Sequence, residues 1–165
     1  MRRVAWWVLV VALTAATLAS VAVGGWQFMA KTAQSAPVAD QPSAREAAIK
    51  AASDATVKVL SYTPATFDED NRAALALLTG NFLESYRKLT SETIRPAVLE
   101  KGTAVTTTVR QAGVESLTAT SAAILLFLKQ RTTSRDSEPK ETTSGVREGL
   151  VKVHGSWLIN SFDPV

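Results

Sequence analysis

The stretch SAAILLFLKQ, residues 121–130, is apolar at both of its alternating sets of positions. Successive side chains of a β-strand point to opposite faces of the sheet. One face would therefore carry Ala122, Ile124, Leu126 and Leu128, and the other would carry Ala123, Leu125 and Phe127. A strand that is apolar on both faces is typical of a sheet that is covered on both faces. The stretch predicts a central strand of this kind.

The flanking segments predict three more strands. Residues 103–117, TAVTTTVRQAGVESL, are rich in β-branched residues, and Gly113 is a candidate bulge. Residues 145–153 and 157–162 read as two further strands, and His154-Gly155-Ser156 forms the turn between them. The polar residues 133–144, TSRDSEPKETTS, are expected to form a loop.

Helices are expected before these strands. A capping box at Ser43–Glu46 would begin a helix that runs to about Leu60, and a second box at Thr66–Glu69 would begin the next one. A third helix would carry Phe82, Tyr86 and Leu89 on one face, be disturbed at Pro96 and end at Gly102. Three helices followed by four strands predict a segregated α+β domain.

These helices can cover one face of a four-stranded sheet, and no further segment remains for the other face. Strong curvature of the sheet could bury part of that back face against itself. Otherwise an exposed apolar face indicates a binding surface. We therefore expect the central strand to dock a second copy of the chain or another protein. The candidate partner-binding residues are Ile124, Leu125, Leu126, Phe127 and Leu128.

The N-terminal region predicts a membrane anchor. Residues 4–30 contain no charged residue, and as a helix they would span roughly 40 Å, enough for a hydrocarbon core of about 30 Å. A cleaved signal peptide ending near Ser20-Val21-Ala22 is the alternative, although the apolar run continues beyond that point. Arg2 and Arg3 favour a cytoplasmic N-terminus. The expected divisions are a cytoplasmic tail (1–3), a transmembrane helix anchored in the membrane lipid bilayer (4–30), a linker (31–42) and an extracytoplasmic domain (43–165).

Composition excludes several functions. Arg2 and Arg3 account for two of the 18 lysines and arginines, and the remaining 16 nearly match the 15 aspartates and glutamates. No basic stripe is left for nucleic acid. The absence of cysteine excludes disulfides, thiol catalysis and cysteine–zinc sites.

No catalytic, cofactor-binding or metal-binding residue is predicted, and no cofactor is expected. His154, the chain's one histidine, lies in the predicted turn without a serine or carboxylate at triad spacing. The acids at 68–70 suit a helix N-terminus and lack the spacing of a calcium loop. Tyr62 and Tyr86 could supply a phenol to an active site, but the helical carboxylates Asp54 and Glu84 point away from the apolar stripes.

Two segments resemble a known family. They are SYTPATFDEDNRAALALLTGNFLESYRKLTSETIRPAVLEKG, residues 61–102, and LVKVHGSWLINSFDPV, residues 150–165. The chain from about residue 47 to residue 165 is similar to the Mce-associated membrane proteins of actinobacteria. The matching pieces include Tyr62, Phe67-Asp68-Glu69-Asp70, Leu78-Thr79-Gly80-Asn81-Phe82, Tyr86 and Asp163-Pro164-Val165.

This resemblance implies a single-pass membrane protein whose domain is like nuclear transport factor 2, with helices on a curved antiparallel sheet. The same architecture is found in the periplasmic domain of an inner-membrane scaffold of type IV secretion. The implied function is that of a non-enzymatic accessory subunit, a scaffold of a mammalian-cell-entry (Mce) transporter that imports lipids or sterols across the cell envelope. A lipid-binding domain that uses the interior of the cone is the alternative. An enzyme like ketosteroid isomerase is a third hypothesis.

Overall fold

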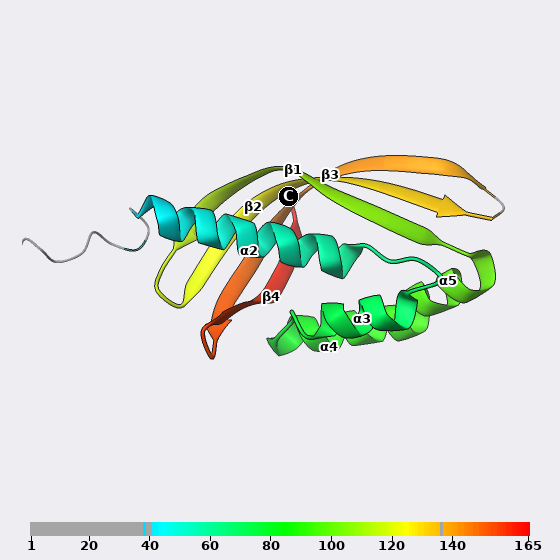
Figure 1. Cartoon of the computed structure of the whole chain (residues 1–165), viewed down its shortest axis with the longest axis horizontal. Helices are drawn as coiled ribbons and strands as arrows, with labels where there is room; N and C mark the ends of the chain where they lie inside the picture. Colours follow the sequence, from blue (N-terminus) through cyan, green and yellow to red (C-terminus); the bar gives the residue numbers. More distant parts are fainter. Residues whose placement is uncertain (1–37, 39–40, 136) are drawn as a thin grey trace, which may run out of the picture. The chain divides into compact units, whose positions relative to one another are not determined.

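A computed structural model describes residue 38, residues 41–135 and residues 137–165. The helical elements come first and the strands follow (Figure 1). The helical elements are α2 (Pro42–Leu60), α3 (Phe67–Leu75), α4 (Gly80–Leu89), the π-helical turn η2 (Thr90–Ile94) and α5 (Arg95–Lys101). The strands are β1 (Ala104–Leu117), β2 (Ser121–Ser134), β3 (Ser137–Val153) and β4 (Ser156–Pro164).

The four strands form one antiparallel sheet in the order β1-β2-β3-β4, so each strand pairs with the next one in the sequence. Figure 1 shows the long strands β1, β2 and β3 curving past α2. The helices α3 and α4 lie on the other side of α2 from these strands. All the helices that cover the sheet therefore lie on one of its faces, which we call the inner face.

Small side chains bring α2 close to the sheet. Ala48 and Ala52 are fully buried and Ala55 is 5% exposed. They pack in the same core as the inner side chains of β2 and β3. Close packing at this density makes the removal or addition of even one methylene costly. The core between α2 and the sheet consequently fixes the position of both.

The third predicted helix is continuous but irregular. Residues 80–101 form α4, η2 and α5 in succession. Pro96 lies in the first turn of α5, where its missing N–H disturbs the helical hydrogen bonds, and the wider π-helical turn directly before it accommodates this. Gly102 ends the helix with a φ of 62°. The predicted disturbance at Pro96 and the end at Gly102 are confirmed.

The predicted helix starts are correct only in part. α2 begins at Pro42 with Gln41 as its N-cap, so Ser43 lies inside the first turn and the predicted capping box is wrong. Proline favours the first helical position, so the helix starts two residues closer to the N-terminus than a Ser43 N-cap predicts. Thr66 is the N-cap of α3, but its hydroxyl donates to Asp70 Oδ2 at 2.6 Å instead of capping the backbone.

The polar segment 133–144 is not a loop. β2 continues to Ser134 and β3 begins at Ser137, so these residues form the end of a long hairpin (Figure 1). The first eight residues of β3 are exposed, because this part of the hairpin extends beyond the core. Pro139 is tolerated because β4 pairs with β3 only from Val146 onward, which leaves that part of β3 at an edge. The segment is polar because its residues are exposed to solvent, and not because it forms a loop.

The register of β1 corrects a second prediction. Gly113 pairs with Leu125 in the regular ladder, and the register shifts lie on either side of it, at Arg110 and Glu115.

The turn predicted around His154 is confirmed. His154 is exposed and has a φ of 49°, and Gly155, with a φ of 87°, follows it.

The predicted fold class requires a correction. It placed a transmembrane helix at residues 4–30, which lie outside the described residues. Within the described residues, no helix has both the length and the apolar character needed to cross a membrane. The supported fold class is an α+β domain, three helical segments on a four-stranded antiparallel sheet, with no membrane-spanning helix in the part of the chain that is described.

Candidate functional site

The candidate residues of β2 divide between the two faces of the sheet. Ile124 and Leu126 are fully buried and Leu128 is 1% exposed, so these three belong to the core under the helices. Leu125 is half-buried on the opposite, outer face, where Phe127 is 44% exposed. Only Leu125 and Phe127 are therefore accessible to a partner.

Glycines on the neighbouring strands leave these two side chains uncovered. Gly113 of β1 pairs with Leu125, and Gly145 of β3 pairs with Phe127. Val165 is 61% exposed and its backbone N–H donates to Gly145 O at 3.1 Å, which places it beside Gly145. We define the outer patch as Gly113, Leu125, Phe127, Gly145 and Val165. A hollow of about 430 Å³, lined in part by Gly113, Leu125 and Phe127, opens on this face.

A salt bridge borders the outer patch. Arg147 Nε donates to Glu115 Oε2 at 2.7 Å, and both side chains are about half exposed. Glu115 lies on β1 and Arg147 on β3, so the pair reaches across β2, where Arg147 is opposite Leu125. The hydrogen bond that Arg147 donates to Glu115 raises the pKa of Arg147. An apolar centre with a charged rim is the usual composition of a protein–protein interface.

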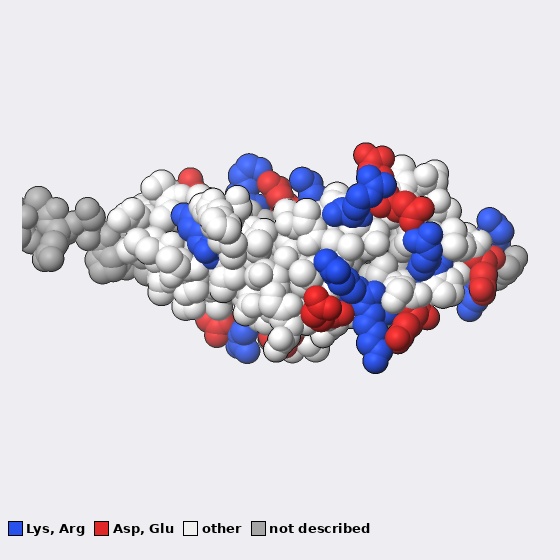
Figure 2. Space-filling model, turned by 90° about the horizontal axis from the view of Figure 1, so that it is seen from below, with Lys and Arg blue, Asp and Glu red and all other residues white. Residues whose placement is uncertain are grey.

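The face seen from below has a different character. Figure 2 shows lysine and arginine side chains interspersed there with aspartate and glutamate side chains. A surface of mixed sign does not form the continuous basic stripe that a phosphate backbone requires.

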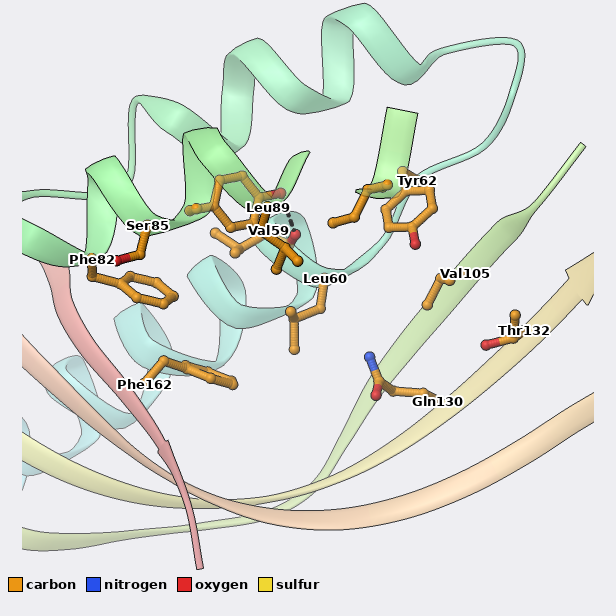
Figure 3. Close-up of a pocket in the computed structure, with 12 residues that line it drawn as sticks. Val59, Leu60, Tyr62, Phe82, Ser85, Leu89, Val105, Gln130, Thr132 and Phe162 are labelled. Atoms are coloured by element: carbon orange, nitrogen blue, oxygen red, sulfur yellow. Dashed lines mark hydrogen bonds between the residues drawn. The ribbon is translucent and has the colours of Figure 1, made fainter. Parts of the chain in front are cut away.

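A pocket of about 460 Å³ lies between the helices and the inner face of the sheet (Figure 3). We call it the inner pocket. Its lining residues come from the end of α2 and the segment that follows it, from α4, from η2 and from the strands β1, β2 and β4. They are Val59, Leu60, Tyr62, Phe82, Ser85, Tyr86, Leu89, Ile94, Val105, Gln130, Thr132 and Phe162.

The two tyrosines considered from the sequence both line this pocket, but they differ. The Tyr86 hydroxyl donates to Val59 O at 2.8 Å, so it joins α4 to α2, and burial raises its pKa. Burial also raises the pKa of Tyr62. Asp54 and Glu84 are exposed, and Asp54 pairs with Lys50 at 2.7 Å on the surface of α2. Neither carboxylate reaches a tyrosine.

One buried carboxyl group was missed. Glu148 of β3 is fully buried, and Thr56 of α2 donates a hydrogen bond to its Oε2. Among the described residues, Oε1 of Glu148 has no hydrogen-bond partner. Burial raises the pKa of Glu148 to about 7, although the bond from Thr56 opposes the shift.

A signal for Glu148 was present in the sequence. Val146, Glu148 and Leu150 alternate along β3, and all three are buried on the inner face. Glu148 therefore occupies the apolar phase of its strand. It pairs in register with Phe162, which lines the inner pocket, but Glu148 itself does not line it. Glu148 and the two tyrosines of the inner pocket therefore do not form an acid–phenol pair.

In the described part of the chain, the remaining polar residues do not form a metal site. Among the described residues, no three histidine or acidic side chains lie close enough together to hold a metal ion. Two of the three acids at the start of α3 have other contacts, since Arg95 donates to Asp68 Oδ1 at 2.6 Å and Thr66 donates to Asp70.

Solved structures share this fold. An IcmL-like type IV secretion system protein from Legionella pneumophila superposes with a TM-score of 0.63 at 10% identity, covering 73% of this chain and 91% of that one. The periplasmic domain of DotI gives 0.59 at 15% identity, covering 73% and 94%. CagV, a VirB8 homolog from Helicobacter pylori, gives 0.58 at 10% identity, covering 73% and 97%. The expected architecture of helices on an antiparallel sheet is confirmed, and so is its likeness to a periplasmic domain of type IV secretion.

Two mycobacterial proteins have a higher sequence identity to this chain than these structures have. No protein-family model matches the chain. Uncharacterized protein Rv1362c of Mycobacterium tuberculosis is 43% identical over 123 residues, which are 74% of this chain but only 56% of that protein, so the chain spans about half of its length. Outer membrane protein Rv1973 of the same organism is 36% identical over 132 residues, covering 80% of this chain and 82% of that protein. The chain belongs to the same protein family as outer membrane protein Rv1973 of Mycobacterium tuberculosis.

Proposed function

We propose that the chain is a non-catalytic accessory subunit of a protein complex in the cell envelope, and that its outer patch docks a partner protein. The observation that carries this proposal is the difference between the two faces of the sheet. Helices cover the inner face, whereas Phe127 and Val165 on the outer face are 44% and 61% exposed. Aromatic side chains in the centre of a patch are the usual anchors of protein interfaces.

The names of similar proteins support the location and the role. One family member is named an outer membrane protein. Structures with the same fold include a periplasmic domain and components of type IV secretion systems. These names favour an extracytoplasmic domain that works within a larger assembly.

We propose more specifically that the partner is a subunit of an Mce-type transporter for lipids or sterols. The support is the resemblance of residues 47–165 to Mce-associated membrane proteins, which includes Tyr62, Tyr86 and the terminal Asp163-Pro164-Val165. Val165 lies in the outer patch, so part of the resembling sequence belongs to the proposed docking surface.

The arrangement of polar groups favours a role without catalysis. General acid–base chemistry needs a titratable group within hydrogen-bond reach of the substrate. The Tyr86 phenol already donates a hydrogen bond to Val59 O, and Glu148 and Thr56, which are hydrogen-bonded to each other, do not line the inner pocket. His154 is exposed in a turn at the far end of β3.

Affinity purification of the full chain from mildly solubilised membranes tests this function. Transporter subunits should be enriched at least about tenfold with the wild-type chain, which corresponds to about 1.4 kcal/mol of differential binding. Gly113→Arg should abolish the enrichment, because an added Cβ at Gly113 meets no atom within 4 Å and the long side chain would cover the patch.

Thr106→Arg is the matched control. Thr106 is exposed on the same strand and the same face, outside the outer patch, so this variant should retain the partner. Recovery of the wild-type chain alone, or equal recovery with both arginine variants, contradicts the proposal. Enrichment of other envelope proteins with the same dependence on Gly113 would keep the accessory role and reject the Mce assignment.

A further inference from the structure

We propose that the inner pocket binds an uncharged, mostly apolar small molecule that carries a hydroxyl or carbonyl group at one end. This inference concerns the opposite face of the sheet from the docking surface, and it does not depend on the proposed function. It rests on the volume of the pocket, on its lining and on the unequal chemistry of its two ends.

The size and the lining suit a small organic molecule. A volume of about 460 Å³ lies within the range of about 300–1,000 Å³ that is usual for ligand pockets. None of the lining residues is charged. The transfer of an ion from water into a site without a charged partner costs several kcal/mol of free energy. This lining therefore selects against charged ligands.

One end of the inner pocket is apolar and aromatic. The rings of Phe82 and Phe162 stack with their centroids 6.0 Å apart and an interplanar angle of 17°. Figure 3 shows these two rings at one end of the pocket, with Leu60 beside them toward the middle. The two rings join α4 to β4, so this end is fixed by elements of the fold and gives an apolar chain a surface to lie against.

The other end carries polar groups with unused hydrogen-bonding capacity. Figure 3 places Tyr62, Gln130 and Thr132 there, around Val105. Backbone hydrogen bonds of 2.9 Å in both directions between Tyr62 and Val105 hold the tyrosine in place. No hydrogen bond to the Tyr62 or Thr132 hydroxyl occurs within the described part of the chain.

The orientation of Gln130 follows from its neighbours. Thr107 Oγ1 donates to Leu60 O at 2.9 Å, so its hydrogen is already used. Thr107 Oγ1 can therefore only accept from Gln130, whose Nε2 lies 3.2 Å away. The amide oxygen of Gln130 is consequently turned away from Thr107 and remains available as an acceptor.

These groups define the polar end of the ligand. The Tyr62 hydroxyl can donate or accept and the amide oxygen of Gln130 can accept, so together they match a hydroxyl group, and Tyr62 alone can donate to a carbonyl. A site built to hydrogen-bond one polar group discriminates strongly against analogues that lack it, because its own polar groups are then left unpaired.

Photo-crosslinking of the full chain tests this proposal. The probe is a long-chain primary alcohol that carries a diazirine, and mass spectrometry maps the crosslinked peptides. Crosslinks should fall on the peptides that contain Phe82, Leu89 and Phe162. Ser85→Trp should remove them, because Ser85 lines the pocket from an exposed position on α4. Glu84→Trp, the exposed neighbour that does not line the pocket, should leave them unchanged.

A competition experiment against the photo-crosslinking probe tests whether the polar end of the inner pocket recognises a hydroxyl group. Dodecanol should displace the probe better than dodecane or dodecanoate, and Tyr62→Phe should reduce the advantage of dodecanol over dodecane about fivefold to tenfold, since one hydrogen bond is lost. Crosslinks that fall elsewhere, or that survive Ser85→Trp, overturn the site. Equal competition by dodecane overturns the polar end, and stronger competition by dodecanoate overturns the selection for an uncharged molecule.

Discussion

Leu126 and Phe127 are consecutive residues of β2, yet one is fully buried and the other is 44% exposed. Both belong to the same apolar stretch, and the sequence offers no difference in composition between their faces. The difference arises from the helices, which cover the inner face and leave the outer face open (Figure 1). The comparison separates two uses of apolar side chains in one strand, since those on the inner face hold the fold together and those on the outer face are available to a partner.

β3 shows the same contrast with charged residues. Arg147 lies on the outer face and pairs with Glu115 in a position accessible to water, whereas Glu148, the next residue, is enclosed on the inner face. The pKa of Arg147 is raised by a charged partner, and that of Glu148 is raised by burial. The outer face therefore accommodates charge, and the inner face favours the neutral form of its acid.

The largest effect is expected for Leu126→Asp. The substitution removes a fully buried apolar side chain and places an unpaired carboxylate in the core. It should lower the free energy of unfolding by more than about 4 kcal/mol and leave the domain unfolded. Denaturant unfolding of the full chain, followed by near-ultraviolet circular dichroism, measures this. Leu126→Met should cost less than about 1.5 kcal/mol. A folded Leu126→Asp domain would refute the assignment of the two faces.

A smaller and pH-dependent effect is expected for Glu148→Gln. Burial raises the pKa from 4.5 to about 7, so the folded domain holds a proton that the unfolded chain releases. Wild-type stability should therefore fall as pH rises from about 4.5 to about 7, by a total on the order of 3 kcal/mol. Glutamine keeps an acceptor for Thr56 and does not ionise.

The free energy of unfolding, measured from pH 4 to pH 8, checks this prediction. The glutamine variant should match the wild type near pH 4, exceed it above pH 7 and show a flatter profile between them. Parallel profiles for the two proteins would mean that Glu148 ionises normally in the folded domain.

Local patterns predicted the order of elements because each element carries its own signal. Apolar periodicity predicted α2 to α4, β-branched composition predicted β1, and the stretch that is apolar on both faces predicted β2. The segment 133–144 was assigned to a loop because it is polar, whereas long-range pairing in the hairpin keeps it extended. A strand that extends beyond the core has no buried face, so alternation vanishes and composition alone is misleading.

The two binding surfaces were predictable to different degrees. The sequence placed five residues of β2 at a docking surface, but which alternate residues face outward depends on where the helices pack. The inner pocket joins Phe82 to Phe162 and Tyr62 to Gln130, which are distant in the sequence. The burial of Glu148, in contrast, could have been predicted from the sequence, because its position between Val146 and Leu150 puts an acid among the inward-facing residues of β3.

The smallest effect on stability, and the most direct test of the account, is expected for Phe127→Asp. Phe127 is half exposed, so its replacement should cost about 1 kcal/mol of unfolding free energy. The same substitution puts a charge in the centre of the outer patch and should reduce partner recovery from membranes at least about tenfold. Thr108→Asp, an exposed position on the same face outside the patch, is the control for added charge and should retain the partner.

The decisive measurement is partner recovery and unfolding free energy determined on the same preparations of wild-type, Phe127→Asp and Thr108→Asp chains. The account predicts that Phe127→Asp remains folded and loses its partner, while Thr108→Asp remains folded and keeps it. A Phe127→Asp chain that is folded and still recovers its partner would contradict docking through the outer patch. A Phe127→Asp domain that unfolds would show that the outer face is part of the core.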